Sequence, residues 1–391
     1  MHASRHESLG GRESRDPDAA GQTIPRVVFD GYYGMRNAGD DAFCVVACHV
    51  AAGRWAVRTV SFVAAQSQLP ITPVPARGIF PDPPRFRGHG RLAPVMRMLR
   101  SRRVVHVGGS TFMRPLTHHR DEMLLARANL LELHAVGVSV GPFRNSKDAA
   151  RVARTLGTFR SITLRDTASL ERLGELSPYI EAEVGFDVAV LLSEVPCVGS
   201  LRRRPVPGRP LLGVSLCAHG AASGTEGDME AQRYERTAAA VLEVVRRTGA
   251  AVRLLVFNDH SLWGDLEISL RLEAHLREAT QVDVVVRGRD TRWLYDAVAD
   301  CDALIATRLH SAVFAYACEV PFALVAYQQK GADFAREVGL PEELLYPAHG
   351  PDPADAAESL VSLLEGAEEL APRLPLEVAR RRARLSFPES L

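Results

Sequence analysis

The sequence predicts an α/β protein built from two successive sheets of parallel strands. Short apolar runs that fit buried strands alternate with longer segments of helical periodicity along most of the 391 residues. A stretch rich in arginine, proline and glycine, residues 197–210, interrupts this alternation near the middle of the chain. Strands that alternate with helices favour parallel sheets, because each helix carries the chain back to the starting edge.

These observations divide the chain into four parts. Residues 1–24 mix Arg, Gly, Ser and Asp without apolar periodicity, which is typical of a disordered tail. Residues 25–196 form the predicted first domain, residues 197–210 the linker, and residues 211–391 the second domain. A chain of this length is sufficient for two domains of ordinary size.

The first domain begins with a strand, a glycine-bearing loop and a helix. The spacing of the glycines matches neither a dinucleotide-binding turn nor an ATP-binding P-loop. Residues 70–91 are rich in proline and glycine and predict a long loop. The strands expected here are 26–30, 55–63, 104–107, 133–140 and 161–164, and the helices are 42–52, 146–156 and one from 167.

The second domain repeats the alternation and ends in helices. A last, basic helix is expected to finish near residue 384. The strands expected are 211–216, 252–257, 282–286, 302–306 and 322–326, and the helices are 228–248, 264–279, 292–299, 311–318 and a short one through 337.

Composition excludes several classes of protein. The hydrophobic content of 46% supports filled cores, and the net charge of zero gives no sign of nucleic-acid or anionic-membrane binding. No apolar run reaches about 18 residues, the length that a membrane span needs. None of the six cysteines forms a CxxC pair, and Cys44 and Cys48 fit buried packing on a helix. This usage favours a reducing cytoplasm, and no compact cluster of metal ligands is evident.

The stretch from Asp302 to Ala312 carries the clearest candidate site. A buried strand ends at Ala306 and a helix follows, so Arg308 and His310 lie where ligands bind in open α/β sheets. If the extended geometry continued, both side chains would point to one side and Leu309 into the core. Arginine suits a phosphate or carboxylate, and histidine titrates near neutral pH. The stretch therefore predicts an anion site with proton transfer.

Other candidate residues also follow predicted strands. The first loop ends in Asn37 and the pair Asp40-Asp41 at a helix start, where we expect one aspartate to cap the helix. Further candidates are Gly108, Gly109, Arg165 and Tyr327, together with Lys330, one of only two lysines in the chain. Retention of lysine among so many arginines indicates a role that a guanidinium cannot fill.

Taken together, these residues give the chain a resemblance to the polysaccharide pyruvyl transferase family, from about residue 27 to about residue 340. The resemblance rests on the order and spacing of several short motifs. They are Gly31-Tyr32-Tyr33-Gly34 with Asn37 and Gly39-Asp40-Asp41; Gly108-Gly109; residues 137–142; Leu164-Arg165-Asp166 with Ser169; Asp187; Gly213-Val214-Ser215; Arg308-Leu309-His310; Pro321; and Tyr327 with Lys330.

The resemblance implies two Rossmann-like domains that face a cleft, as in GT-B glycosyltransferases, with the last helix crossing back to the first domain. It implies phosphoenolpyruvate as donor, a hydroxyl pair of a sugar, glycan or lipid-linked sugar as acceptor, and a cyclic ketal and phosphate as products. Arg165, Arg308 and His310 match its donor-site positions, and Asn37 and Asp40 its N-terminal site. We expect His310 and Asp40 to be the general acid and the general base of the reaction, in either assignment. We expect no metal or other cofactor.

Two alternatives stay open on the sequence alone. A GT-B glycosyltransferase or sugar 2-epimerase would need a carboxylate for a nucleotide's ribose, and Glu319 is the candidate, one turn into the helix after His310. A non-catalytic sugar- or anion-binding relative would not need a titrating pair such as Asp40 and His310.

Overall fold

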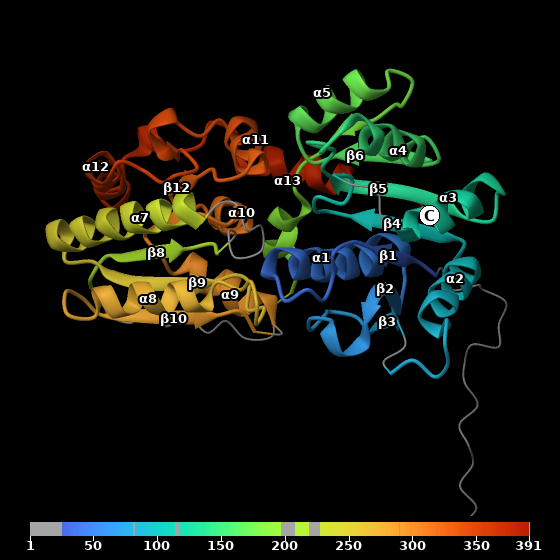
Figure 1. Cartoon of the computed structure of the whole chain (residues 1–391), viewed down its shortest axis with the longest axis horizontal. Helices are drawn as coiled ribbons and strands as arrows, with labels where there is room; N and C mark the ends of the chain where they lie inside the picture. Colours follow the sequence, from blue (N-terminus) through green and yellow to red (C-terminus); the bar gives the residue numbers. More distant parts are fainter. Residues whose placement is uncertain are drawn as a thin grey trace, which may run out of the picture.

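The computed structural model describes residues 26–80, 83–113, 117–196, 208–218, 227–288 and 290–390. It contains two sheets of parallel strands with helices packed on them, which confirms the predicted α/β class (Figure 1). The expected tail, residues 1–24, and residues 197–207 of the expected linker lie outside the described residues.

The first sheet has seven strands in the order β3-β2-β1-β4-β5-β6-β7. Its central strands are buried, since helices cover them, and their sequences are correspondingly apolar. The strands are β1 (Val28–Asp30), β2 (Val60–Ala65), β3 (Ala76–Phe80), β4 (Arg103–Val107), β5 (Glu132–Val138), β6 (Ser161–Leu164) and β7 (Glu183–Val184).

The second sheet has six strands in the order β10-β9-β8-β11-β12-β13. Every residue of β8, β9, β11 and β12 is buried, which explains their near-continuous apolar sequences. The strands are β8 (Leu211–Ser215), β9 (Ala251–Val256), β10 (Val282–Val286), β11 (Ala303–Ala306), β12 (Phe322–Val325) and β13 (Leu345–Tyr346).

The helices connect successive strands in both halves. In the first half they are α1 (Ala38–Trp55), α2 (His89–Ser101), α3 (Thr117–Arg127), α4 (Ser146–Leu156) and α5 (Thr167–Leu176), with the 3-10 helices η2 (Gln66–Gln68) and η3 (Val188–Glu194). In the second they are α7 (Gly227–Thr248), α8 (Leu266–Leu276), α9 (Thr291–Ala299), α10 (Leu309–Ala317), α11 (Gln329–Val338), α12 (Pro353–Leu364) and α13 (Leu376–Leu385), with η4 (Glu342–Leu344) and η5 (Glu368–Leu370). Among the described helices, none combines the length and the apolar character that a membrane crossing requires.

The last helix lies against the first half of the chain (Figure 1). Arg384 of α13 pairs with Glu194 of η3 at 2.5 Å. Just beyond the helix, the Ser386 carbonyl accepts a hydrogen bond from the Thr163 hydroxyl at 3.0 Å, and the Pro388 carbonyl accepts one from the Trp55 indole at 3.0 Å. These contacts hold the end of the chain across the junction between the halves.

The N-terminus of α1 reaches the second sheet. The backbone N–H of Ala38 donates to the Phe257 carbonyl at 2.9 Å, immediately after β9 ends. Asn37 and Asn258 also form an isolated antiparallel bridge. Because β1 ends just before this loop, the C-terminal edges of the two sheets meet here.

Three expectations about local structure were wrong. The expected loop at 70–91 contains the edge strand β3 and the start of α2, because a short, half-exposed edge strand leaves little apolar signal. Trp55 closes α1 instead of opening a strand. The helix after β11 begins at Leu309 and not near Ser311, so the extended geometry stops at Arg308.

Candidate active site

The candidate residues gather where the C-terminal edges of the two sheets meet. From the first half come the start of α1 and the loops after β4 and β6, and from the second half come the N-termini of α10 and α11. The positive charges of Arg165, Arg308 and Lys330 all act on His310. Burial sharpens these interactions, because screening by water is weak there.

The first turn of α1 separates the roles of three polar residues. Asn37 caps the helix, since its side-chain oxygen accepts a hydrogen bond from the Gly39 N–H at 3.1 Å. The expectation that an aspartate caps this helix was therefore wrong. Asp41 instead pairs with Arg287 of the second half at 2.6 Å, with both side chains buried. Asp40 lies beside Gly109, where an added Cβ would lie 3.7 Å from its carboxylate, an ordinary contact distance.

Two ionisable groups here have pKa values near neutrality. Burial and the neighbouring Asp41 raise the pKa of Asp40 to about 7, although Lys330 opposes the shift. Burial, together with Arg165 and Arg308, lowers the pKa of Lys330 to about 8, although Asp40 opposes that shift. Groups with such values can gain or lose a proton at neutral pH, as acid–base catalysis requires.

His310 packs directly onto the first turn of α1. A Cβ at Gly39 would lie 1.8 Å from the His310 Nδ1, so only glycine leaves space for the ring. The ring also meets Phe43 edge-on, with centroids 5.2 Å apart. Since His310 is in the first turn of α10 and not on a strand, this packing, and not strand alternation, determines where the imidazole points.

The surroundings of His310 favour the neutral form of its imidazole. Burial lowers its pKa well below the ordinary value, and the positive charges of Arg165, Lys330 and Arg308 add to the effect. Its Nε2 lies 3.8 Å from a carboxylate oxygen of Asp187, which is buried at the start of η3. A neutral imidazole near a buried carboxylate is suited to accepting a proton.

Arg165 is a buried cation with one donor group to spare. Its Nε lies 3.4 Å from Asp166 and its Nη1 lies 3.4 Å from Asp187. Asp166 is itself fixed as the N-cap of α5, where it accepts from the Ser169 N–H at 2.7 Å. The Nη2 of Arg165 has no hydrogen-bond partner among the described residues. A buried donor without a partner is costly, so it indicates a place for an anion.

Arg308 forms an ion pair that the sequence did not predict. Its Nε and Nη2 donate to the two carboxylate oxygens of Asp265 at 2.9 and 2.6 Å. Asp265 is fully buried and also accepts the Asn258 N–H at 3.1 Å. Because this pair occupies one edge of the guanidinium, a ligand could reach only the N–H groups that remain.

The loop after β4 and the loop after β12 complete the arrangement. Gly108 and Gly109 have φ of 68° and 74°, a backbone that glycine adopts without strain. A Cβ at Gly108 would lie 2.6 Å from the Phe43 ring, so the loop packs tightly on α1. Tyr327 lies with its ring 5.1 Å from the Arg233 guanidinium, and burial raises its pKa well above the ordinary value.

Three hydroxyls that were not singled out as site residues also lie at these edges. Ser215 ends β8, Thr307 follows β11, and Ser139 follows β5. Each is buried, and its oxygen has no hydrogen-bond partner among the described residues. Their strand-end positions could have indicated them, as could that of Arg287, which directly follows β10. Asp265 gave no such signal because it lies at the start of α8.

The space beside Arg165 is small. A cavity of about 10 Å³ lies beside Arg165 and Asp187, bounded by Phe186 and Phe334, which is roughly the space of one water molecule. Arg172 of α5 also pairs with Asp333 of α11 across the junction at 2.6 Å. This ion pair joins the first half of the chain to the second.

Known structures with the same fold include UDP-N-acetylglucosamine 2-epimerases and a protein solved with UDP and glucose. A UDP-N-acetylglucosamine 2-epimerase is 11% identical, with a TM-score of 0.62 over 93% of this chain and 94% of that one. The epimerase from Neisseria meningitidis, solved with UDP-GlcNAc, is 9% identical, with a TM-score of 0.60 over 92% and 97%. Anabaena HepE, solved with UDP and glucose, is 13% identical, with a TM-score of 0.53 over 93% and 96%. At these identities the likeness establishes the GT-B-like fold alone.

The sequence comparison identifies the family. No curated protein matches the chain. The family profile of the polysaccharide pyruvyl transferases matches residues 70–329, a span that includes Arg165, Arg308 and His310. Asp40 lies before this span and Lys330 lies directly after it. This match covers more than half of the chain and agrees with the motifs found in the sequence. The chain therefore belongs to the polysaccharide pyruvyl transferase family and is a transferase.

Proposed function

We propose that this enzyme transfers the pyruvyl group of phosphoenolpyruvate to a hydroxyl pair of a sugar or glycan, forming a cyclic ketal and releasing phosphate. The observation that carries this proposal is the unpartnered Nη2 of Arg165, buried beside the neutral imidazole of His310. An anion binds at such a donor, and the adjacent base activates a hydroxyl. Family membership supports pyruvyl transfer in general.

The cations divide the work of holding the donor. Arg165 is the main anchor in this scheme, because Arg308 already uses one edge of its guanidinium on Asp265. Lys330 supplies a third cation from the first turn of α11. A hydrogen bond to a charged group typically contributes about 1.5–3 kcal/mol, so loss of Arg165 should weaken donor binding substantially. These side chains can neutralise the phosphate and carboxylate of phosphoenolpyruvate without a metal.

The acid and the base follow from the two shifted pKa values. Asp40, with a pKa of about 7, is largely protonated below neutrality and can protonate the methylene carbon. Neutral His310 then takes the proton of the attacking hydroxyl as the first C–O bond forms at C2. The second hydroxyl attacks as the C–O bond to phosphate breaks. The methyl group keeps the proton given by Asp40, the first hydroxyl proton returns from His310 to Asp40, and the second leaves with phosphate. Each turnover therefore balances without a further reactant.

A nucleotide-sugar enzyme is the competing possibility, since the structural neighbours include UDP-GlcNAc 2-epimerases. The carboxylate expected to serve a ribose in that case is not where it was placed. Glu319 is exposed and lies beyond the end of α10, not one turn into it. A nine-residue helix separates it from His310 by about 13 Å, which leaves the alternative without its expected contact.

Phosphate release tests the proposal. The protein is incubated with phosphoenolpyruvate and a panel of sugar glycosides, and in a parallel arm with UDP-GlcNAc. We expect acceptor-dependent phosphate release, lost in Arg165→Gln and kept in Arg246→Gln, which alters an exposed arginine of α7. Turnover of UDP-GlcNAc with phosphoenolpyruvate inert would favour the epimerase-like alternative.

We also expect the reaction to take place in the cytoplasm, because the described cysteines are free thiols.

A further inference from the structure

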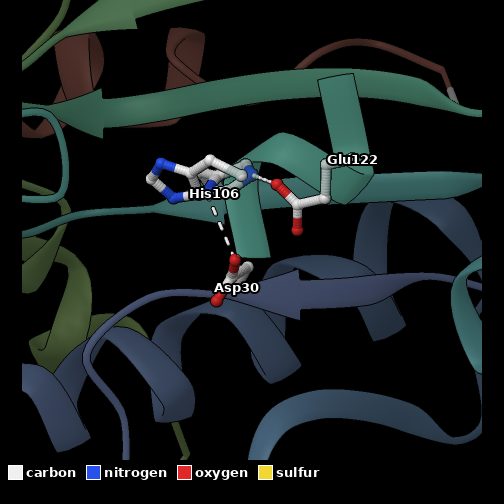
Figure 2. Close-up of side chains that lie close together, drawn as sticks. Asp30, His106 and Glu122 are labelled. Atoms are coloured by element: carbon white, nitrogen blue, oxygen red, sulfur yellow. Dashed lines mark hydrogen bonds and ion pairs between the residues drawn. The ribbon is translucent and has the colours of Figure 1, made fainter. Parts of the chain in front are cut away.

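A second group of ionisable side chains lies within the first half, away from the candidate active site. It consists of Asp30, His106, His119 and Glu122, and we call it the Asp-His cluster. Figure 2 shows three of its members, Asp30, His106 and Glu122. All four residues are buried, with at most 3% of the surface of each exposed. One ligand atom from each lies within 4.8 Å of the others. No spacing along the chain indicates such a group, because its members come from three separate elements.

The fold holds these four residues on rigid elements. Asp30 ends β1 and is paired in register with His106 on the adjacent parallel strand β4, so both side chains leave the same face of the sheet. His119 and Glu122 are three residues apart on α3 and therefore lie on one face of that helix. The rings of His106 and His119 meet edge-on with centroids 5.2 Å apart.

The charges of the cluster fit a dication. The Nε2 of His106 lies 3.0 Å from a Glu122 oxygen, and its Nδ1 lies 3.7 Å from an Asp30 oxygen (Figure 2). Two carboxylates carry two negative charges, and burying them is expensive unless opposite charge is close. A doubly charged metal ion would neutralise them while both imidazoles stay neutral.

We propose that Asp30, His106, His119 and Glu122 bind a structural zinc-type ion. Two imidazoles with two carboxylates suit zinc and related first-row ions, whereas magnesium and calcium prefer oxygen ligands alone. Four protein ligands in a buried position are typical of a closed structural site, which keeps no open position for a substrate. To reach metal distances of about 2.0–2.2 Å, the more distant ligand atoms would approach one another. The His106 and Glu122 atoms, now 3.0 Å apart, would separate slightly.

The ion would fasten α3 to the sheet beneath the Gly108-Gly109 turn. His106 lies two residues before this turn, and Phe112 lies just after it. The centroid of the Phe112 ring is 5.6 Å from that of His106 and 5.4 Å from that of His119. The turn lies beside Asp40, so the metal would support the active site without touching substrate.

The surroundings also affect how the ion would enter. His119 lines an open cavity of about 1010 Å³ between α2, α3 and α4. Its wall carries several arginines, among them Arg120, Arg151 and Arg154, which repel a passing cation. We therefore expect the ion to enter during folding and to exchange slowly afterwards.

Metal content of the purified protein is the first test. Protein produced with zinc in the medium and passed through a chelating column should retain about one zinc per chain by mass spectrometry. His119→Gln and Glu122→Gln should each lower this content at least tenfold. The control His134→Asn alters a buried histidine of β5 that bonds Ser161 and should leave the content unchanged. Retention of the metal in both cluster variants would overturn the proposal.

A second measurement does not depend on the variants folding. Wild-type protein refolded with Co²⁺ should show visible bands of nitrogen and oxygen ligation without the near-ultraviolet band that cysteine thiolates give. Removing the metal with a chelator during refolding should lower Tm by roughly 5–10 °C. If wild-type protein takes up neither Zn²⁺ nor Co²⁺, the cluster is a set of ion pairs in which protonated histidines neutralise the carboxylates, and no metal site exists.

Discussion

Replacing Gly39 by alanine separates the chemistry of His310 from the stability of the fold. The added Cβ would lie 1.8 Å from the His310 Nδ1, whereas ordinary contacts begin at 3.4 Å. The ring must therefore retreat by more than an ångström. A misplacement of about 1 Å can cost ~100-fold in rate, so we expect turnover to fall by roughly that factor.

The same substitution should not unfold the protein. Alanine is a better helix former than glycine by about 0.5–1 kcal/mol, which offsets part of the cost of moving the ring. Gly53→Ala is the matched control, because Gly53 is in the same helix and a Cβ there would meet nothing within 4 Å. The control should keep full activity and gain a little stability.

The assay is steady-state phosphate release combined with thermal unfolding of both variants. We expect Gly39→Ala to lose turnover while Tm falls by only a few degrees, about the cost of local overpacking. Gly53→Ala should behave like the parent protein or slightly better. If Gly39→Ala keeps normal turnover, the position of His310 does not matter to the reaction, and the base must be sought elsewhere.

Four further predictions concern Asp40, Lys330 and Arg287. Asp40→Asn should lower turnover by about 10²–10⁴-fold, and it should remove the loss of activity above about pH 7 that deprotonation of Asp40 causes. If the variant still loses activity above this pH, another group causes the loss. The pKa of Asp40 rises from 3.8 to about 7 on folding, so its contribution to stability is lost as pH rises through this window, and Asp40→Asn should raise Tm more at about pH 8 than at about pH 4. Lys330→Arg should lose activity despite keeping its charge, and normal turnover would show that lysine is dispensable there. Arg287→Met should lower the free energy of unfolding by about 3–5 kcal/mol, measured by chemical unfolding, because it leaves Asp41 buried without this partner. The double variant with Asp41→Leu should recover much of the lost stability. If it does not, loss of the ion pair is not the cause.

The sequence predicted most of the fold because apolar runs and the hydrophobic periodicity of helices and strands can be read from neighbouring residues. The bounds of α4, β6 and β10 agree with the expected ranges, since each is a regular element flanked by clear breaks. Strand β3 escaped because it is short and lies at an edge, where alternation is weak and neighbouring proline suggests a loop. The start of α10 escaped because the carbonyl of Arg308 already accepts helical hydrogen bonds, a change that side-chain type does not reveal.

The candidate site was predictable only in part. Strand ends pointed to Arg165, Arg308 and Lys330, and the structure brings them close enough to influence one another electrostatically. The pairing of Arg308 with Asp265 was not predictable, because Asp265 lies at the start of α8, far away in sequence. The same holds for the Asp-His cluster, which exists only once β1, β4 and α3 have packed together.

The most direct test of the proposed reaction follows the carbon atoms of the donor. Phosphoenolpyruvate labelled with ¹³C at C2 is incubated with the enzyme and an acceptor that supports phosphate release, and the product is examined by NMR and mass spectrometry. Pyruvyl transfer predicts a labelled quaternary ketal carbon coupled to the sugar and one phosphate released per ketal formed. Labelled free pyruvate with an unmodified acceptor, or no consumption of phosphoenolpyruvate at all, would contradict it.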